Sequence, residues 1–165
     1  MTIKLELKKR LDEAESFGEV FQVVKRAVRE VLGLGRAGLE LILMNLPKEV
    51  RAIHQIGSNV IVMNKKLLES LFASSKTRSE INAYIFSILL REYIRSLGVL
   101  DEEEMRRLAI KVVKEALGED HIAYRIISKG LPEEYQDLKG EIGREFDHNA
   151  EFVEDFDREN TQYIG

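Results

Sequence analysis

One uncharged stretch, Ala83 to Leu90, constrains the fold of this chain more than any other part of the sequence. Its apolar side chains would point to every side of a helix, and a helix that is apolar all round is usually buried at the centre of a domain. Thr77 and Glu80 form a capping-box signature before the stretch, and Gly98 follows it. The sequence therefore predicts a central helix from about Thr77 to Leu97, surrounded by the other elements.

Capping signals and hydrophobic periodicity predict further helices around this one. Ser16 with Glu19, and Asp101 with Glu104, are two more capping pairs. The predicted helices run from about residue 3 to 15, from 16 to Gly33, from 65 to 73, from 101 to Gly118, and from 120 to 128.

Three strands are predicted, at about Leu39–Met44, Arg51–Ile56 and Asn59–Met63. Turn residues join them over short distances, which favours an antiparallel meander. The expected fold class is therefore α+β and helix-rich, with a small antiparallel sheet of about three strands packed on several helices. Residues 33–38 match the spacing G-x-G-x-x-G, but a helix precedes them and a strand follows. A dinucleotide site needs the reverse order, so these glycines are interpreted as a connection.

Composition narrows the class of protein further. The chain has 165 residues, of which 44% are hydrophobic, and it contains no cysteine. Disulfides and cysteine nucleophiles are therefore excluded. The first ten residues lack the apolar stretch of a signal peptide, and no segment approaches 18 uncharged apolar residues. We expect a cytoplasmic protein that does not act at a membrane.

The charges are unevenly distributed along the chain. Residues 133–165 contain 11 acidic and 3 basic residues, so this segment carries −8, whereas the rest carries +4. The expected organisation is a folded domain over residues 1–130, with N-terminal helices over 1–33, and an acidic C-terminal appendage over 131–165. The appendage either stays solvated, folds back onto the basic body, or docks on a partner. No basic cluster or aromatic platform stands out, so no nucleic-acid partner is expected.

The candidate site lies in the second half of the predicted central helix, at Arg91-Glu92-Tyr93-Ile94-Arg95. Arg91 and Arg95 are one turn apart and share a helix face. Charges in a buried helix are costly unless they are paired, so the fold must supply partners or an open cleft. With histidine in place of both arginines, the segment would read H-E-Y-I-H. That is the zincin motif H-E-x-x-H, in which two histidines hold zinc and the glutamate acts as general base.

The surroundings of this segment resemble minimal archaeal gluzincin-type zinc peptidases. The similar segments are Asn59–Glu69, which looks like their edge strand and following helix, Glu92–Leu108, which resembles their active-site helix and the turn after it, and Lys114–His121, which resembles their second helix. The resemblance covers about Gly35 to Ser128. It implies a zincin-like domain in which Glu92 holds the place of the general base and Glu115 that of the third zinc ligand. It also implies that a peptide adds to an edge strand formed by Asn59, Val60, Ile61, Val62 and Met63.

This chain departs from the family pattern at both metal-binding histidines. Arginine stays protonated and offers no lone pair to a metal, so we expect neither zinc nor another cofactor at Arg91 and Arg95. We expect instead a salt-bridge cluster in which the two guanidinium groups meet Glu115 and, in addition, Glu92. Glu115 should then point inward or to the rim, although an ordinary charge at the edge of an amphipathic helix is the alternative.

The sequence leaves three functions open. The first is a catalytically inactive metallopeptidase homologue whose cleft binds a peptide or protein partner. The second is an active metallopeptidase or other hydrolase with ligands that the sequence does not identify. The third is an interaction module that acts through the acidic appendage. His54 is expected on a strand, half-buried or lining a cleft, while His121 and His148 are expected to play local roles.

Overall fold

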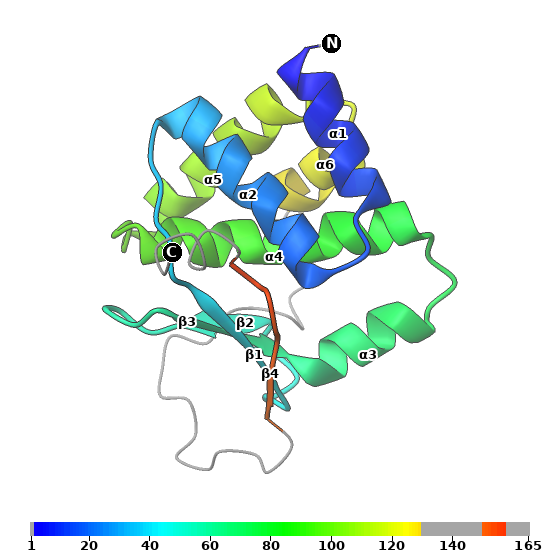
Figure 1. Cartoon of the computed structure of the whole chain (residues 1–165), viewed down its shortest axis with the longest axis vertical. Helices are drawn as coiled ribbons and strands as arrows, with labels where there is room; N and C mark the ends of the chain where they lie inside the picture. Colours follow the sequence, from blue (N-terminus) through cyan, green and yellow to red (C-terminus); the bar gives the residue numbers. More distant parts are fainter. Residues whose placement is uncertain (1, 130–149, 158–165) are drawn as a thin grey trace.

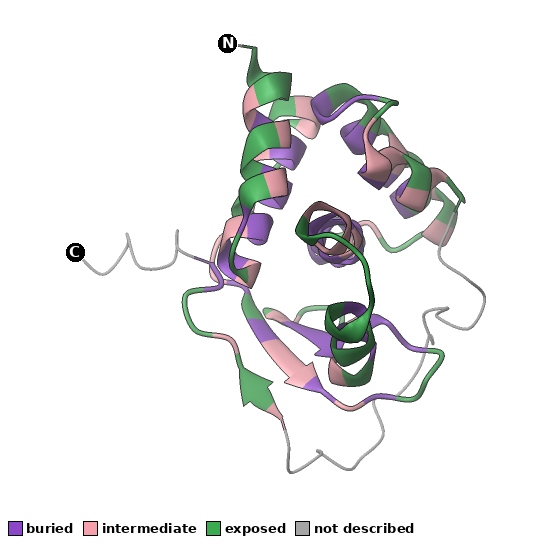
Figure 2. Ribbon diagram, turned by 90° about the vertical axis from the view of Figure 1, so that its right-hand side faces the viewer, coloured by how far each residue is buried: buried purple, intermediate pink, exposed green. Residues whose placement is uncertain are grey.

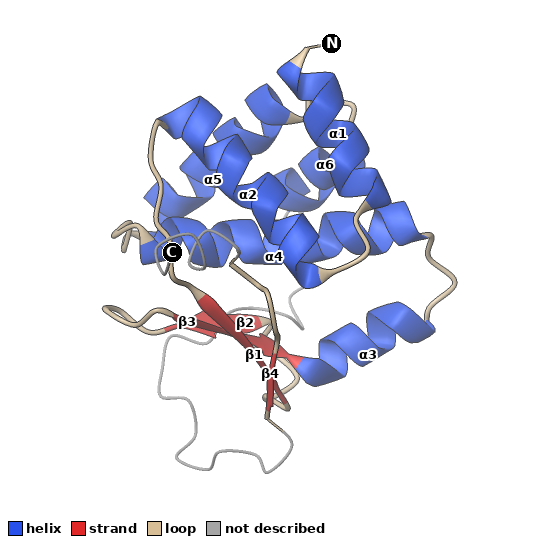
Figure 3. Ribbon diagram, in the orientation of Figure 1, coloured by secondary structure: helices blue, strands red, loops and turns tan. Residues whose placement is uncertain are grey.

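The computed structural model describes residues 2–129 and 150–157 and has an α+β, helix-rich architecture (Figures 1 and 3). The helices are α1 (Ile3–Glu13), α2 (Phe17–Leu32), α3 (Lys65–Ala73), α4 (Arg78–Ser96), α5 (Glu102–Ala116) and α6 (Ile122–Lys129). The strands are β1 (Glu40–Met44), β2 (Ala52–His54), β3 (Val60–Asn64) and β4 (Glu151–Phe152). None of these helices is long and apolar enough to cross a membrane.

Helix α4 is the central element, as the sequence predicts. It contacts α1, α2, α5 and α6 among the helices and β2 in the sheet. Phe86, Leu89 and Leu90 are completely buried, and so is Tyr93 one turn later. Figure 2 looks almost along α4 and shows it between the other long helices above and the sheet with α3 below. Most side chains of α4 from Asn82 to Ser96 are therefore buried against a neighbouring element.

The predicted capping residues begin the helices. The Ser16 hydroxyl accepts the Glu19 N–H at the start of α2, and the Thr77 hydroxyl and Glu80 carboxylate complete a capping box at the start of α4. Asp101 accepts the Glu104 N–H at the start of α5. Each cap satisfies an N–H group that has no partner within its own helix. The helix boundaries consequently fall within about two residues of those expected.

The sheet differs from the predicted meander. Its strand order is β2-β3-β1-β4, in which β1 pairs with β3 in parallel and β2 pairs with β3 antiparallel. The predicted antiparallel pairing of the second and third strands is confirmed, but the all-antiparallel meander is wrong: the sheet is mixed and has four strands among the described residues. Strand β3 lies between β2 and β1, so consecutive strands β1 and β2 do not pair.

Asn64 provides a physical reason for this topology. Its side-chain amide donates to the carbonyl oxygens of Leu46 at 3.3 Å, Pro47 at 3.2 Å and Val50 at 2.8 Å. Its Oδ1 accepts the Leu46 N–H at 3.2 Å. These bonds hold the loop after β1 against the end of β3. The chain therefore crosses to the other side of β3 before β2 begins. A buried amide with this many partners fixes one loop path.

Part of the predicted acidic appendage belongs to the folded body. Strand β4 pairs antiparallel with β1, and the Val153 N–H donates to the Leu41 carbonyl at 2.9 Å (Figure 1). The acidic appendage was expected to stay solvated, to fold back onto the domain, or to dock on a partner. For residues 150–157, folding back onto the domain is what the structure shows. Residues 130–149, which include His148, and residues 158–165 lie outside the described part of the chain.

Candidate functional site

The predicted site residues lie together at the C-terminal half of α4. Arg91 and Arg95 share one face of the helix, as their spacing requires, and their side chains are 15% and 17% exposed. Glu92 is almost completely buried and its carboxylate accepts a hydrogen bond from the Arg95 guanidinium. Both arginines are therefore held mostly out of water, where they need anionic partners.

The anion that joins the two arginines is Glu102, in the first turn of α5. One of its oxygens, Oε1, accepts from Arg91 at 3.0 Å and from Arg95 at 3.1 Å. Its other oxygen, Oε2, accepts a second bond from Arg95 at 2.9 Å. Arg91, Glu92, Arg95 and Glu102 thus form one arginine–glutamate cluster with two positive and two negative charges. Charge-assisted bonds of this kind are stronger than neutral ones and fix the geometry of both partners.

Glu115 does not take the place predicted for it. Its side chain lies on the exposed side of α5, and the carboxylate that meets the arginines comes from Glu102, near the other end of the same helix. The prediction of an inward-pointing Glu115 is wrong, and its alternative as an ordinary exposed charge holds. Residues 109, 112, 113 and 116 supply the buried face of α5, so position 115 faces away from it.

Arg36 is a residue of this region that the sequence did not single out. It lies in the glycine-rich connection between α2 and β1, and its backbone N–H donates to the Tyr93 hydroxyl at 2.9 Å. Its guanidinium donates to the Ser96 carbonyl at 2.8 Å and to the Ser58 carbonyl at 3.2 Å. Arg36 thereby ties the end of α4 to the β2–β3 turn. The only signal in the sequence was an isolated arginine among glycines.

His54 lies on β2 beside this region. Its Nε2 is 2.8 Å from the Ser58 carbonyl oxygen. Burial lowers the pKa of His54 below its ordinary value, and the positive charges of Arg36 and Arg95 lower it further, while the bond to Ser58 acts in the opposite sense. A protonated imidazole is therefore disfavoured in the folded protein. The expectation of a half-buried strand histidine is met, next to the cationic side chains of α4 and its neighbouring loop.

The lowered pKa of His54 predicts a specific pH dependence of stability. The unfolded chain binds this proton near the ordinary histidine pKa of 6.5, whereas the folded chain binds it only at lower pH, so wild-type stability should fall as the pH drops below about 6.5. In His54→Gln this loss is absent. Urea unfolding of both proteins between pH 5 and 8 measures it. A stability difference that does not change with pH would contradict the prediction.

The strand predicted to receive a peptide is not at an edge. Residues 60–63 belong to β3, which pairs along one side with β1 and along the other with β2. The side chain of Asn59, just before it, donates to the Gly38 carbonyl at 3.3 Å. The backbone groups of Val60, Ile61, Val62 and Met63 are therefore engaged within the sheet, and the prediction of a peptide-binding edge at residues 59–63 is wrong. The sheet edges belong to β2 and β4.

The described residues hold no group of three or more His, Asp or Glu side chains arranged to bind a metal ion. At the arginine–glutamate cluster, two of the four side chains are cations without lone pairs. The donor set there does not fit zinc, which takes three protein ligands from neutral imidazole, thiolate or carboxylate groups.

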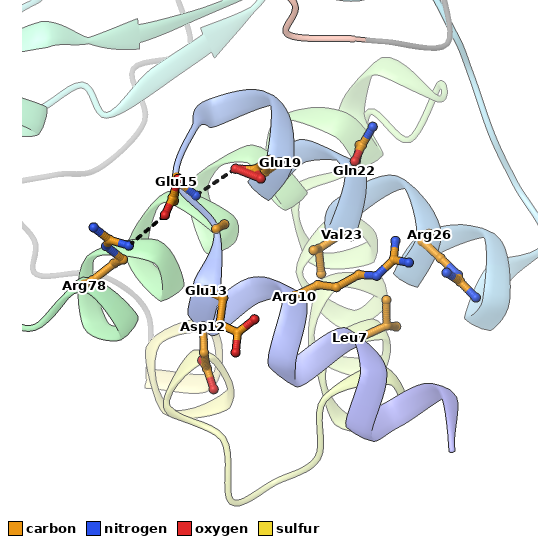
Figure 4. Close-up of a pocket in the computed structure, with 11 residues that line it drawn as sticks. Leu7, Arg10, Asp12, Glu13, Glu15, Glu19, Gln22, Val23, Arg26 and Arg78 are labelled. Carbon is orange, nitrogen blue, oxygen red and sulfur yellow. Dashed lines mark hydrogen bonds and ion pairs between the residues drawn. The ribbon is translucent and has the colours of Figure 1, made fainter. Parts of the chain in front are cut away.

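A hollow of about 630 Å³ lies elsewhere, between α1, α2 and the start of α4 (Figure 4). Its rim carries charges that already have partners. Arg78 pairs with Glu15 at 3.5 Å, and the Glu15 N–H donates to the Glu19 carboxylate at 2.9 Å. These side chains are mostly exposed, and exposed pairs contribute little energy. The charged residues that line the hollow are not buried, unlike Glu92 in the cluster on α4.

Several charged groups gather at the C-terminal half of α4. Two mostly buried arginines share a bridging carboxylate there, and the charge of Arg95 also acts on His54 of the neighbouring strand β2. Perturbed titratable groups of this kind gather at functional sites and at structural ion-pair networks alike. No family model, curated protein sequence or solved structure matches the chain.

Proposed function

We propose that this protein is a non-catalytic relative of gluzincin-type zinc peptidases, in which the arginine–glutamate cluster replaces the metal centre and the scaffold serves to bind a protein or peptide. The observation that carries the proposal is the bridging position of Glu102. Its single carboxylate meets Arg91 and Arg95, the two positions that the zincin motif gives to zinc-binding histidines. Two guanidinium groups bring the same formal charge as one zinc ion.

The chemistry of the cluster argues against hydrolysis of the zincin type. That reaction needs a metal with an open position to lower the pKa of a bound water. It also needs a glutamate that is free to take the proton of that water. Here the Glu92 carboxylate accepts a hydrogen bond from the Arg95 guanidinium, so part of it is already engaged within the cluster. The cluster is therefore suited to hold α4 and α5 together rather than to activate water.

Restoring the histidines tests whether this is a former zinc site. In the double variant Arg91→His, Arg95→His, two imidazoles one turn apart face the Glu102 carboxylate, which is positioned to serve as third ligand. We expect this variant to bind zinc stoichiometrically, and the wild type purified without a metal-affinity tag to hold none. Metal analysis and calorimetric titration measure both. Casein hydrolysis by the wild type that a chelator abolishes would contradict the proposal.

A matched control separates the site from the spacing of the histidines alone. Lys111 and Glu115 lie on the exposed side of α5 at the same spacing of four residues. Lys111→His, Glu115→His therefore creates a histidine pair without a carboxylate aimed at it. We expect the pair on α4 to bind zinc at least about 10-fold more tightly, which corresponds to 1.4 kcal/mol. Equal affinity of the two variants would remove the support for a former metal site.

A further inference from the structure

The segment 150–157, which we call the docking segment, ends in a buried ion pair with α2. The Asp157 side chain is 1% exposed and that of Lys25 is 4% exposed, and their Oδ1 and Nζ atoms are 2.8 Å apart. The second oxygen of Asp157 accepts the Leu39 N–H at 3.1 Å. A buried carboxylate with both oxygens engaged is recognised by charge and by geometry. This contact therefore selects an aspartate at the end of the segment.

An aromatic contact lies next to this ion pair. The Phe156 ring stacks on Phe21 with centroids 4.1 Å apart and planes inclined by 19°. Phe21 in turn meets the Tyr93 ring edge-on at 5.4 Å, so the stack reaches α4. Phe156 is 2% exposed. Aromatic pairs contribute beyond the area that they bury, so Phe156 is the apolar anchor of the docking segment.

The start of the docking segment is extended and lies on a sheet edge, where Glu151 pairs with Lys65 at 2.6 Å, and residues 154–156 then form a turn. Only two residue pairs join β4 to β1, followed by the bond from Val153 to Leu41. The backbone of the segment then passes so close to α2 that a Cβ added at Gly18 would stand 2.4 Å from the Asp155 carbonyl oxygen. We call the surface formed by Gly18, Phe21, Lys25, Leu39 and Leu41 the docking groove. Addition of a strand with pockets for alternate side chains is a common mode of peptide recognition.

The connection to the docking segment permits an alternative arrangement. Twenty residues separate Lys129, the end of α6, from Ala150. When extended they would span up to about 66 Å, more than the width of a domain of this size. The segment can therefore reach a groove on another molecule. Exchange of identical elements forms every contact of the monomer again, so it has a low cost.

From these contacts we propose that the docking segment also binds in the docking groove of a second copy of this chain, which links two copies by exchange. The second copy is the matching occupant because the groove requires a strand followed by an aromatic residue and an aspartate, and residues 151–157 carry that pattern. Binding within one chain competes with exchange, at an effective concentration on the order of 1 mM. The fraction of exchanged dimers therefore rises with protein concentration, and also when docking within the chain is blocked.

Two full-length variants block docking within the chain in different ways. Gly18→Ala closes the groove, because the added Cβ meets the Asp155 backbone, but it leaves the docking segment intact. Asp157→Lys spoils the segment, because a lysine there would face Lys25, but it leaves the groove intact. Neither variant pairs with itself. In a mixture, the segment of the first variant fits the groove of the second.

The experiment is light scattering after size exclusion on each variant and on their equimolar mixture, with native mass spectrometry to identify the species. We expect monomers from each variant and heterodimers from the mixture. Replacing the second variant by Gly18→Ala, Asp157→Lys should abolish the heterodimer, because neither groove is then open. Gly35→Ala, whose added Cβ meets nothing closer than 3.8 Å, should behave as the wild type.

A mixture that remains monomeric at about 1 mM protein would overturn the proposal. If Gly18→Ala does not fold, as circular dichroism would show, the wild-type chain replaces it. Isotopically heavy and light wild-type protein, concentrated together and then diluted, should form dimers of mixed mass that are absent from heavy and light Asp157→Lys protein. No mixed dimers in the wild type would overturn the proposal by the second route.

Discussion

Replacing Phe21 by alanine is expected to lower the free energy of unfolding by about 3–5 kcal/mol, the usual cost of deleting a buried aromatic ring. Phe21 is completely buried and joins two other rings, Phe156 on one side and Tyr93 on the other. Its loss leaves a cavity beside the central helix and removes the platform for Phe156. The variant should therefore lose stability and also release the docking segment.

Urea unfolding monitored by circular dichroism measures the effect of Phe21→Ala. Phe72→Ala is a matched control, since Phe72 is 57% exposed and its removal should change stability little. Phe156→Ala should cost less than Phe21→Ala, because it leaves the contact between Phe21 and Tyr93 in place. If Phe21→Ala lowers the free energy of unfolding by less than about 1 kcal/mol, the contacts of Phe21 with Phe156 and Tyr93 do not stabilise the fold as expected.

Replacing Glu102 by alanine is expected to cost about 2–3 kcal/mol. Removing one partner of a fully buried ion pair costs about 3–5 kcal/mol, whereas an exposed pair contributes up to about 1 kcal/mol. The arginines here are mostly buried, but the Glu102 side chain is 41% exposed, so the expected value lies between these limits. Stability falls because Arg91 and Arg95 both lose the carboxylate between them. Their two positive charges then repel each other without a bridging anion.

Glu103→Ala is the matched control for this prediction. Glu103 is the next residue in the first turn of α5 and is exposed. Its replacement therefore removes a favourable interaction with the helix dipole but leaves the arginine–glutamate cluster intact. That effect should amount to about 0.3–1 kcal/mol. A double-mutant cycle with Arg95→Met isolates the pairwise energy. Equal losses in Glu102→Ala and Glu103→Ala would mean that the bridge contributes nothing to stability.

The sequence predicted the helices well because their signals are local. Ser16, Thr77 and Asp101 cap the helices that they were expected to cap, and the uncharged stretch after Ala83 lies at the centre of the fold. The need for partners at Arg91 and Arg95 was also foreseen, since two charges on a buried helix face require anions. Such rules depend on residues a few positions apart.

The errors concern contacts between residues that are distant in sequence. The strand order depends on Asn64, which binds a loop 14 to 18 residues earlier and takes β2 to the far side of β3. The bridging acid is Glu102 rather than Glu115 because Glu102 lies against the two arginines of α4, whereas Glu115 is on the exposed side of α5. The sequence left open whether the acidic segment folds back onto the body, because the role of Asp157 depends on Lys25, 132 residues earlier. The resemblance to gluzincins did not predict these long-range contacts either.

The distance between Lys25 and Asp157 has a consequence for biosynthesis. The 117 residues 33–149 separate α2 from the docking segment, and at about 5–20 residues per second the ribosome needs roughly 6–23 s to make them. During that time every nascent chain presents Phe21 uncovered and Lys25 without Asp157. On a polysome, neighbouring nascent chains are at high local concentration during the time in which α2 has been made but the docking segment has not. The segment of the chain furthest along in translation could then be captured by a younger neighbour before it reaches its own helix.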